Sequence, residues 1–351
     1  MKKILKALGI LLLALILLVG GFIGYLSVTE YHPQSVEDAV GTVGGTPFRD
    51  GQSLTILSWN IGYAGLDKDA DFFMDGGTSV YPVSQDHVTE NLRAIDTYIH
   101  EAGTDLVILQ EVDRDSTRTG HVDEYDMLSH DFAGAYAPNY RCAYVPYPLP
   151  PIGKVESGLA IYSVTGSPAV QPQRVALPCP FSWPVSMANL KRCLLVSTIP
   201  LEGSDKNLVV VNLHLEAYDD GEGKVAQTAA LMSLLQEEYG KGNYVIAGGD
   251  WNQTVPGGLD NFPMQSADLW TPGTLGDSAL PEGWCYAVDT GTATCRSLDR
   301  ALDAEDPTMQ YYVIDGFLLS PNVTLTSVET QDLGFANSDH NPVRLEVVLG
   351  N

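Results

Sequence analysis

Basic residues are scarce in this sequence, and their scarcity limits what the protein can bind. The 351 residues include 19 Lys and Arg against 44 Asp and Glu, a formal net charge of -25. Lys2, Lys3 and Lys6 precede the apolar N-terminus, so residues 29–351 keep 16 basic and all 44 acidic residues, a charge of -28. Such a surface repels polyanions and lacks the broad basic face that duplex DNA requires. It still allows an enzyme to hold a phosphate locally through a metal ion.

Charge is absent altogether from Ala7 to Thr29. These 23 residues are mostly apolar, and about 20 such residues cross the hydrocarbon core of a bilayer. Lysines occur only on the N-terminal side of this apolar stretch, which predicts that the N-terminus lies in the cytoplasm and the rest of the chain outside. A cleaved signal peptide is the alternative, although its apolar core usually has about 7–15 residues and no typical cleavage site follows Gly24. We expect an anchor over residues 1–29, and both interpretations export the remainder.

Cysteine is also infrequent, with five residues in the chain. Their spacings match no zinc-binding pattern. An exported chain can form disulfides, and Cys285 with Cys295 and Cys179 with Cys193 are plausible pairs that leave Cys142 over. Free buried thiols are an equally good interpretation.

The sequence has neither an internal repeat nor a second linker. Residues 30–52 are rich in Gly, Pro and Thr and are expected to form a tether, so one catalytic domain covers residues 53–351. Short β-branched runs in that domain predict strands at 54–60, 105–111, 158–163, 193–199, 208–216, 244–252 and 311–320. Apolar residues at helical spacing predict helices at 86–101 and 224–239, ended by Gly103 and Gly240. Strands mixed with helices indicate an α/β or α+β domain.

Polar side chains stand at the ends of these strands, where a scaffold presents residues to a cleft. They are Asn60, Glu111, His214, Asp250, Asn252, Asp315, Asp339 and His340. Each alone has an ordinary explanation, such as Asn60 as a turn residue or His214 as a hydrogen-bonded core histidine. Together they offer carboxylates and amides for a hard metal ion, two histidines, and an Asp-x-Asn pair that can hold a water molecule. The set therefore indicates a catalytic site.

The segments around these residues resemble motifs of the endonuclease/exonuclease/phosphatase superfamily. In chain order they are SWN, LQE, NLHLE, GGDWN, VIDG and SDHNPV. The resemblance implies a four-layer sandwich in which two packed, mostly antiparallel β-sheets are flanked by helices. It also implies a metal site at Asn60, Glu111 and Asp339, with Glu111 as the principal Mg²⁺ ligand.

The resemblance implies catalytic roles for the other five residues. His214 would contact the scissile phosphate, Asp250 would orient or deprotonate the attacking water, and Asn252 would help to fix the phosphate. His340 would be the catalytic histidine and Asp315 its carboxylate partner.

These residue types suit phosphoester hydrolysis. A phosphoester is an anion that repels hydroxide, and a metal ion on a non-bridging oxygen withdraws charge and stabilises the transition state. Oxygen ligands favour Mg²⁺, with Mn²⁺ or Ca²⁺ possible, over Zn²⁺. A positioned carboxylate base contributes about 10²–10⁴-fold. A histidine held by Asp315 is protonated more easily and can donate to a phosphate oxygen or leaving group.

The substrate is less closely defined. Glu156 or Ser157 stands where the superfamily's abasic-site endonucleases carry a tyrosine, which argues against abasic-site repair. There is also no Lys and Arg cluster for a polyphosphorylated inositol ring. Apolar, aromatic and Pro-rich segments at 143–152 and 181–184 are either loops beside the cleft that meet a lipid, sugar or base, or ordinary packing between strands.

We therefore expect a monomeric, single-pass membrane enzyme with an extracellular, metal-dependent phosphoester hydrolase domain. Its substrate would be a lipid headgroup, a nucleotide or a phosphosugar. An extracellular DNase I-like endonuclease is one alternative, and a catalytically inactive anchored binding protein is another.

Overall fold

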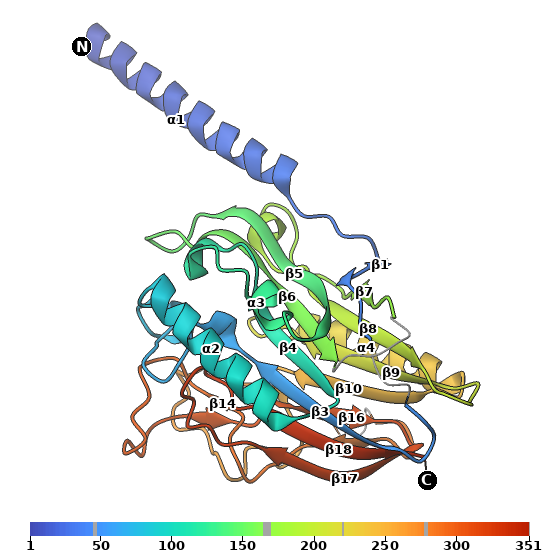
Figure 1. Cartoon of the computed structure of the whole chain (residues 1–351). Coiled ribbons are helices and arrows are strands. Elements are labelled where there is room, and N and C mark those ends of the chain that lie inside the picture. Colours follow the sequence, from blue (N-terminus) through green and yellow to red (C-terminus); the bar gives the residue numbers. More distant parts are fainter. Residues whose placement is uncertain (45–47, 164–169, 220, 277–279, 351) are drawn as a thin grey trace.

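Two seven-stranded β-sheets pack face to face, and helices cover their outer faces (Figure 1). The computed structural model describes residues 1–44, 48–163, 170–219, 221–276 and 280–350. An apolar helix, α1 (Lys2–Thr29), precedes the sheets. The predicted sandwich of mostly antiparallel sheets with helices outside is confirmed.

The first sheet has the strand order β17-β18-β3-β4-β6-β5-β2. Every neighbouring pair is antiparallel except β3 and β4, which run parallel. Its strands are β2 (Val40–Gly41), β3 (Ser53–Asn60), β4 (Leu106–Asp113), β5 (Ala133–Val145), β6 (Gly153–Ser163), β17 (Val323–Thr330) and β18 (Val343–Leu349).

The second sheet has the order β1-β7-β8-β9-β10-β16-β13, with β9 and β10 as its one parallel pair. Its strands are β1 (Val36–Asp38), β7 (Gln173–Ala176), β8 (Cys193–Pro200), β9 (Asn207–His214), β10 (Tyr244–Asp250), β13 (Cys285–Ala287) and β16 (Asp315–Leu319). Two small ladders lie outside both sheets and join β11 (Gln253–Thr254) to β12 (Gly273–Thr274) and β14 (Cys295–Arg296) to β15 (Tyr311–Tyr312).

Three apolar layers stabilise the sandwich. The central layer lies between the sheets and contains alternate residues of their strands, such as Ile56, Ile108, Val210 and Phe317. The helix α2 (Gln85–Ala102) covers the first sheet, and α4 (Glu222–Gly240) covers the second. Each fully buried Leu, Ile or Val contributes about 1.5–3 kcal/mol, so the layers fix the sheets that carry the strand ends.

The two predicted helices are present, with one difference at an end. Ser84 caps α2 by accepting a hydrogen bond from the His87 backbone N–H, and Gly103 ends it with φ +56°. Gly240 does not stop α4 as expected, because the Lys241 N–H still donates to the carbonyls of Glu237 and Glu238. The short helices are α3 (Glu124–Leu128) and the 3₁₀ turns η1 (Gly62–Ala64), η2 (Phe73–Asp75), η3 (Thr117–Thr119) and η4 (Val185–Ala188).

Part of the expected tether is built into the domain. Val36–Asp38 pairs with β7, and Val40–Gly41 pairs with β5, so this segment joins the edges of both sheets. The Gly-rich composition did not indicate strands, but open sheet edges favour pairing with any extended segment. Residues 45–47 of the tether lie outside the described residues.

All five cysteines lie within the described residues and are free thiols. Cys142, Cys193 and Cys295 are buried, while Cys179 and Cys285 are exposed. Neither of the two plausible disulfide pairs is formed, and the alternative of free thiols describes this structure.

Candidate functional site

One cleft of about 210 Å³ lies where the strands of both sheets end. Six of the eight predicted site residues line it, namely Glu111, His214, Asp250, Asn252, Asp339 and His340. Asn60 and Asp315 lie directly behind, each hydrogen-bonded to a lining residue. The parallel pairs β3/β4 and β9/β10 bring their carboxyl ends to the same edge of each sheet. Residues from six separate segments therefore meet at one place.

The register of the second sheet places three site residues in a row. Asp250 is the cross-strand partner of His214 on β9 and of Asp315 on β16. The Nε2 atom of His214 lies 3.5 Å from Asp250 Oδ2. The row therefore puts Asp250 between a histidine and a second carboxylate, all with buried side chains.

Asn60 joins the two sheets at the cleft floor. Its Nδ2 donates to Glu111 Oε1 at 3.2 Å and to Asp250 Oδ2 at 3.0 Å, and its Oδ1 accepts from the Gly62 backbone N–H. A single amide thus sets the separation of two carboxylates from different sheets. The Asn60 side chain acts from behind the cleft as a positioning group in this structure.

Two of the predicted site residues have left-handed backbone conformations. Glu111 has φ +55° and lies in a β-bulge of β4, where the pairing with β6 shifts between Leu109 and Val112. Asn252 has φ +49°. Such conformations cost about 1–3 kcal/mol in non-glycine residues and concentrate at functional sites, and the bulge turns Glu111 toward the cleft.

The SDHNPV segment forms a turn whose polar atoms are tied to the strands. His340 Nδ1 lies 2.8 Å from Asp315 Oδ2, and the His340 carbonyl accepts from Trp59 Nε1 at 2.8 Å. Ser338 Oγ donates to the Asn60 carbonyl at 2.8 Å and accepts from the His340 N–H. These contacts hold the imidazole in one orientation, with Nε2 directed to the cleft.

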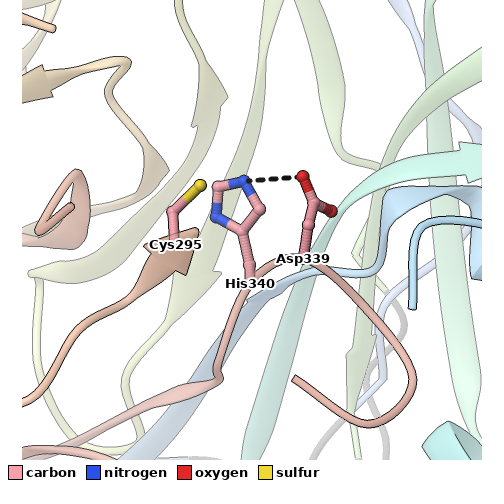
Figure 2. A group of neighbouring side chains, drawn as sticks. All are labelled: Cys295, Asp339 and His340. Atoms are coloured by element: carbon pink, nitrogen blue, oxygen red, sulfur yellow. Dashed lines mark ion pairs between the residues drawn. The ribbon is translucent and has the colours of Figure 1, made fainter. Parts of the chain in front are cut away.

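Figure 2 shows the surroundings of that imidazole nitrogen. Asp339 Oδ2 lies 3.9 Å from His340 Nε2, and Asp250 Oδ2 lies 3.8 Å from the same nitrogen. Cys295 on β14 stands on the other side of the ring, and its backbone pairs with that of His340. Neither carboxylate is within hydrogen-bond distance of Nε2, and the Cys295 thiol interacts with the same ring.

The family model described as endonuclease/exonuclease/phosphatase matches residues 57–340. The chain belongs to this family. Family members are generally hydrolases that act on phosphoesters, and the family includes nucleases. The matched range begins within β3 and ends at His340, so it includes all eight predicted site residues.

Several solved structures share the fold. An endonuclease/exonuclease/phosphatase from Beutenbergia cavernae DSM 12333 is 19% identical, with 86% of this chain and 72% of that chain covered and a TM-score of 0.58. Truncated TDP2 from Caenorhabditis elegans is 17% identical, with 85% of this chain and 99% of that chain covered and a TM-score of 0.51. The human Nocturnin catalytic domain with bound sulfate is 17% identical, with 86% of this chain and 96% of that chain covered and a TM-score of 0.50. No curated protein matches. At these identities the likeness establishes the fold.

The ionisable groups of the cleft have opposite pKa shifts. Burial, together with the neighbouring Asp315 carboxylate, raises the pKa of Asp250 to about 7. Burial alone would lower the pKa of His340, but the Asp315 carboxylate outweighs it and raises that pKa well above its usual value. Burial, with the positive Arg192 nearby, lowers the pKa of His214. Such a separation is typical of acid and base pairs, with His340 protonated and His214 neutral near pH 7.

The acidic residues of the cleft fit a divalent cation. Glu111, Asp250 and Asp339 line it together with Asp75 from η2. Burial and the charge of Glu111 raise the pKa of Asp75 and of Asp339 to about 6 each. Within the described part of the chain, no Lys or Arg forms an ion pair with any of the four, and the nearest charged or titratable partners of Glu111, Asp250 and Asp339 are His214 and His340. Family members typically depend on a divalent metal, and an oxygen-donor set with unbalanced charge is what Mg²⁺ prefers.

The closest groupings of potential metal ligands leave out Glu111. They are Cys295, Asp339 and His340, and Asp250, Asp315 and His340, each with its ligand atoms within 4.8 Å of one another. Both groups include His340, whose Nδ1 already lies 2.8 Å from Asp315 Oδ2. We therefore assign the acidic opening beside Glu111 and Asp339, rather than these two groups, as the position that suits a hard cation.

Several residues at the cleft were not predicted from the sequence. Tyr218 donates to Asp75 Oδ1 at 2.9 Å and joins the loop after β9 to η2. Nothing in the residue 61–84 loop indicates that Asp75 would fold over the cleft. Arg296 is buried and donates only to backbone carbonyls, which belong to Asp67, Ala70, Ser297 and Arg300. It therefore brings a positive charge to the cleft wall.

A buried polar bridge under the cleft was also missed. Gln110 Nε2 donates to Asn212 Oδ1 at 2.8 Å, and Asn212 Nδ2 donates to the carbonyls of Leu109 and Ala160. Both side chains are fully buried. The sequence does contain a signal for this bridge, because Asn212 interrupts the apolar run LVVVNLHLE, and a buried amide requires hydrogen-bond partners.

Proposed function

We propose that this protein is a divalent-metal-dependent phosphoester hydrolase that α1 anchors in the cell membrane with its catalytic domain outside. The substrate would be a lipid-borne or small-molecule phosphoester. The observation that supports this most is the pairing of Asp250 with the His340–Asp315 dyad in one cleft. His340 Nδ1 is 2.8 Å from Asp315, and His340 Nε2 is 3.8 Å from Asp250.

The arrangement suits in-line attack of water on phosphorus. Asp250 holds the water and accepts its proton as the oxygen–phosphorus bond forms. His340 donates its Nε2 proton to the departing alkoxide as the phosphorus–oxygen bond breaks, while Asp315 stabilises the imidazolium. His214 Nε2 lies 3.5 Å from Asp250 Oδ2 and 4.0 Å from Glu111 Oε1, so this nitrogen would meet the phosphoryl group between the two carboxylates. Asn252 is fixed by hydrogen bonds to Leu215 and Asp250 and completes the wall beside the phosphate.

The residues that would hold a cation are Glu111 and Asp339, with Asn60 orienting Glu111. A divalent ion bound there would withdraw charge from a phosphoryl oxygen. The polypeptide's own contribution is to keep Glu111 in its bulge and to keep the neighbouring carboxylates near their common opening.

The substrate preference follows from charge. The chain beyond α1 carries -28, so a long polyanion would bring many phosphates against an acidic surface with few cations to offset the repulsion. A single phosphate on a lipid or small molecule meets only the local field of the cleft. We therefore rank lipid and small-molecule phosphoesters above DNA.

The proposal is tested by direct competition between substrates. The full-length protein, in lipid nanodiscs with Mg²⁺ at fixed salt, would be offered choline and ethanolamine phosphodiester lipids, soluble phosphomonoesters and phosphodiesters, and plasmid DNA. We expect kcat/KM to be highest for a lipid or small-molecule phosphoester, and His340→Gln to abolish that activity. A clear preference for plasmid DNA would favour the nuclease alternative. No hydrolysis of any substrate would favour an inactive binding protein.

A further inference from the structure

The C-terminal end of α1 is fixed to the domain by specific contacts. Trp183 Nε1 donates to Ser27 Oγ at 3.1 Å, and Ser27 Oγ lies 3.1 Å from Met187 Sδ. Just beyond the helix, Glu30 accepts from Lys191 Nζ at 2.8 Å, with both side chains largely buried. The domain is therefore held against the end of α1, and it meets the helix through η4 and the residues before it.

A second segment of the domain contacts α1 about two turns before its C-terminal end. The rings of Phe22 and Tyr144 contact edge to face with their centroids 5.9 Å apart. Phe22 precedes Thr29 by seven residues, about 10 Å along a helix that rises 1.5 Å per residue. The uncharged stretch Ala7–Thr29 is about 34 Å long by the same rise, slightly more than the hydrocarbon core. When α1 spans a bilayer, Phe22 and the Tyr144 ring that contacts it therefore lie within the outer leaflet, below its headgroups.

Figure 1 shows α1 extending from the side of the domain where β5 and β6 lie. The end of β5, the turn that joins it to β6, and the segment that leads into η4 carry five exposed large apolar residues. We call them the interfacial surface: Tyr144, Tyr147, Leu149, Trp183 and Val185. Leu149 is 89% exposed and Tyr147 69%, so neither contributes to the core.

The interfacial surface is free of charge in a strongly acidic protein. No charged residue occurs between Ala143 and Ile152 or between Val175 and Leu190. Tyr and Trp are the residues that concentrate where a membrane meets water. An uncharged aromatic face next to the membrane helix avoids the repulsion that the rest of the surface would experience at anionic lipid headgroups.

The same two segments continue into the cleft. Ile152 follows the β5–β6 turn, Phe181 precedes Trp183, and both line the cleft. The ring of Tyr147 also contacts that of Phe73 at 5.9 Å, and the neighbours of Phe73 line the cleft as well. These segments thus form an apolar wall with residues both at the interfacial surface beside α1 and in the cleft.

We propose that the interfacial surface inserts into the outer leaflet beside α1 and that the cleft receives its phosphoester from that leaflet. The proposal rests on the proposed function for α1 as a membrane anchor and for the cleft as a hydrolytic site. It narrows the substrate to a phosphoester on a membrane lipid. The acyl chains stay in the leaflet against the apolar wall, while the headgroup phosphate reaches His340 and Asp250.

Trp183 provides a direct probe of insertion. It is 61% exposed, whereas Trp59, Trp251 and Trp284 are buried and Trp270 lies in the cleft wall. The full-length protein would be reconstituted in phosphatidylcholine vesicles with bromine on the upper part of the acyl chains. We expect bromine to quench the tryptophan emission of the natural protein and to quench that of Trp183→Phe clearly less. Equal quenching in the two proteins would overturn the proposal.

A pair of matched variants tests the consequence for turnover. Leu149→Asp places a charge in the interfacial surface, and Val225→Asp places one on α4, where Val225 is 70% exposed outside the cleft. We expect Leu149→Asp to lower kcat/KM for vesicle-borne phosphoester by about tenfold, equivalent to about 1.4 kcal/mol, with hydrolysis of a soluble phosphoester kept. Val225→Asp should change neither rate.

The two proposals fail separately. Equal loss on vesicle-borne and soluble substrates in Leu149→Asp would contradict the leaflet route, because the surface would then act on the cleft itself. Absence of all hydrolysis would contradict the proposed function, while the quenching of Trp183 would still report whether the surface is inserted.

Discussion

At the scale of single residues, the cleft depends on a carboxylate and a histidine that both hold a proton more tightly than they would in water. Asp250 has its pKa raised to about 7 by burial and by Asp315, while the Asp315 carboxylate raises that of His340. Both groups owe their shifts to the same neighbour, and they lie 3.8 Å apart. They are expected to act on one phosphate as a unit rather than separately.

This coupling predicts non-additive losses. Asp250→Ala and His340→Ala should each lower kcat by about 10²–10⁴-fold, and the double variant should lose far less than the product of the two, as groups that act together do. Steady-state kinetics of the three variants, with circular dichroism to show that each is folded, provides the measurement. Multiplicative losses would mean that the two residues act independently.

A buried acid away from the reacting atoms gives a second prediction at this scale. Glu124 on α3 is fully buried and accepts from the Asp113 backbone N–H. Burial, with the adjacent Asp113 carboxylate, raises the pKa of Glu124 well above its usual value. The folded chain therefore holds this proton to a higher pH than the unfolded chain does, and this group's contribution to stability falls as pH rises.

Glu124→Gln keeps the hydrogen bond and removes the titration. We expect the thermal midpoint of the variant, relative to the natural protein, to be higher at pH 8 than at pH 5. Calorimetry at the two values provides the comparison, and Glu90→Gln at an exposed position of α2 is the control. A midpoint difference that is the same at both pH values would show that Glu124 is ionised in the folded chain throughout this range.

The residues of the cleft could largely be predicted, but their neighbours could not. Asn60, Glu111, His214 and Asp250 each follow an apolar strand, so position in the chain indicates exposure at a sheet edge. Asp75 has no such context, because its place over the cleft depends on how the 61–84 loop folds and on its hydrogen bond to Tyr218. Contacts made by irregular loops leave no periodic signal in a sequence.

At the scale of elements, the turn after β3 controls the position of Asp339. Gly62 in η1 has φ +50°, and a Cβ atom there would lie 2.8 Å from Asp339 Oδ1 and 3.3 Å from Ser338 Oγ. Any side chain at this position must displace the Asp339 carboxylate, which belongs to the SDHNPV turn, and would also crowd Leu66. The close approach of η1 to that turn is therefore a requirement of the site itself.

Gly62→Ala should lower kcat/KM by about 10²-fold, the loss expected when a reacting group moves by about 1 Å. Gly203→Ala is the matched control, because Gly203 has φ +73° and open space around its missing Cβ. Both variants pay the cost of a left-handed conformation, about 1–2 kcal/mol, but Gly203→Ala should keep its activity. Equal activity of Gly62→Ala and Gly203→Ala would contradict the role of η1 in positioning Asp339.

The elements that were predicted are those with strong periodicity. The strands from β3 to β16 that carry site residues were found from β-branched runs, and α2 and α4 from helical spacing. β5 was missed because Gly134, Pro138 and Asn139 are poor strand residues, and here the pairing with β6 outweighs propensity. β17 was missed because most of its side chains are exposed or half-buried, so its sequence does not alternate. Edge strands are set by their partners more than by their own residues.

At the scale of the whole molecule, the apolar helix and its flanking charges predict on which side of the membrane the acidic domain lies. Within α1, lysines occur only before the apolar stretch, which predicts a cytoplasmic N-terminus. Protease added to intact cells should therefore remove the domain, whereas a cytoplasmic control protein should survive until lysis. A domain that also survives until lysis would contradict the extracellular location.

The central claim is that the cleft hydrolyses phosphoesters with a divalent cation beside Glu111. The most direct test is hydrolysis of the preferred phosphoester by the full-length protein, titrated with Mg²⁺ after treatment with EDTA, for the natural protein and Glu111→Gln. The account predicts negligible hydrolysis in EDTA, full recovery with Mg²⁺, and for Glu111→Gln a kcat about 10²-fold lower with a higher Mg²⁺ concentration at half activity. Undiminished hydrolysis in EDTA, or a Glu111→Gln titration that overlays that of the natural protein, would contradict it.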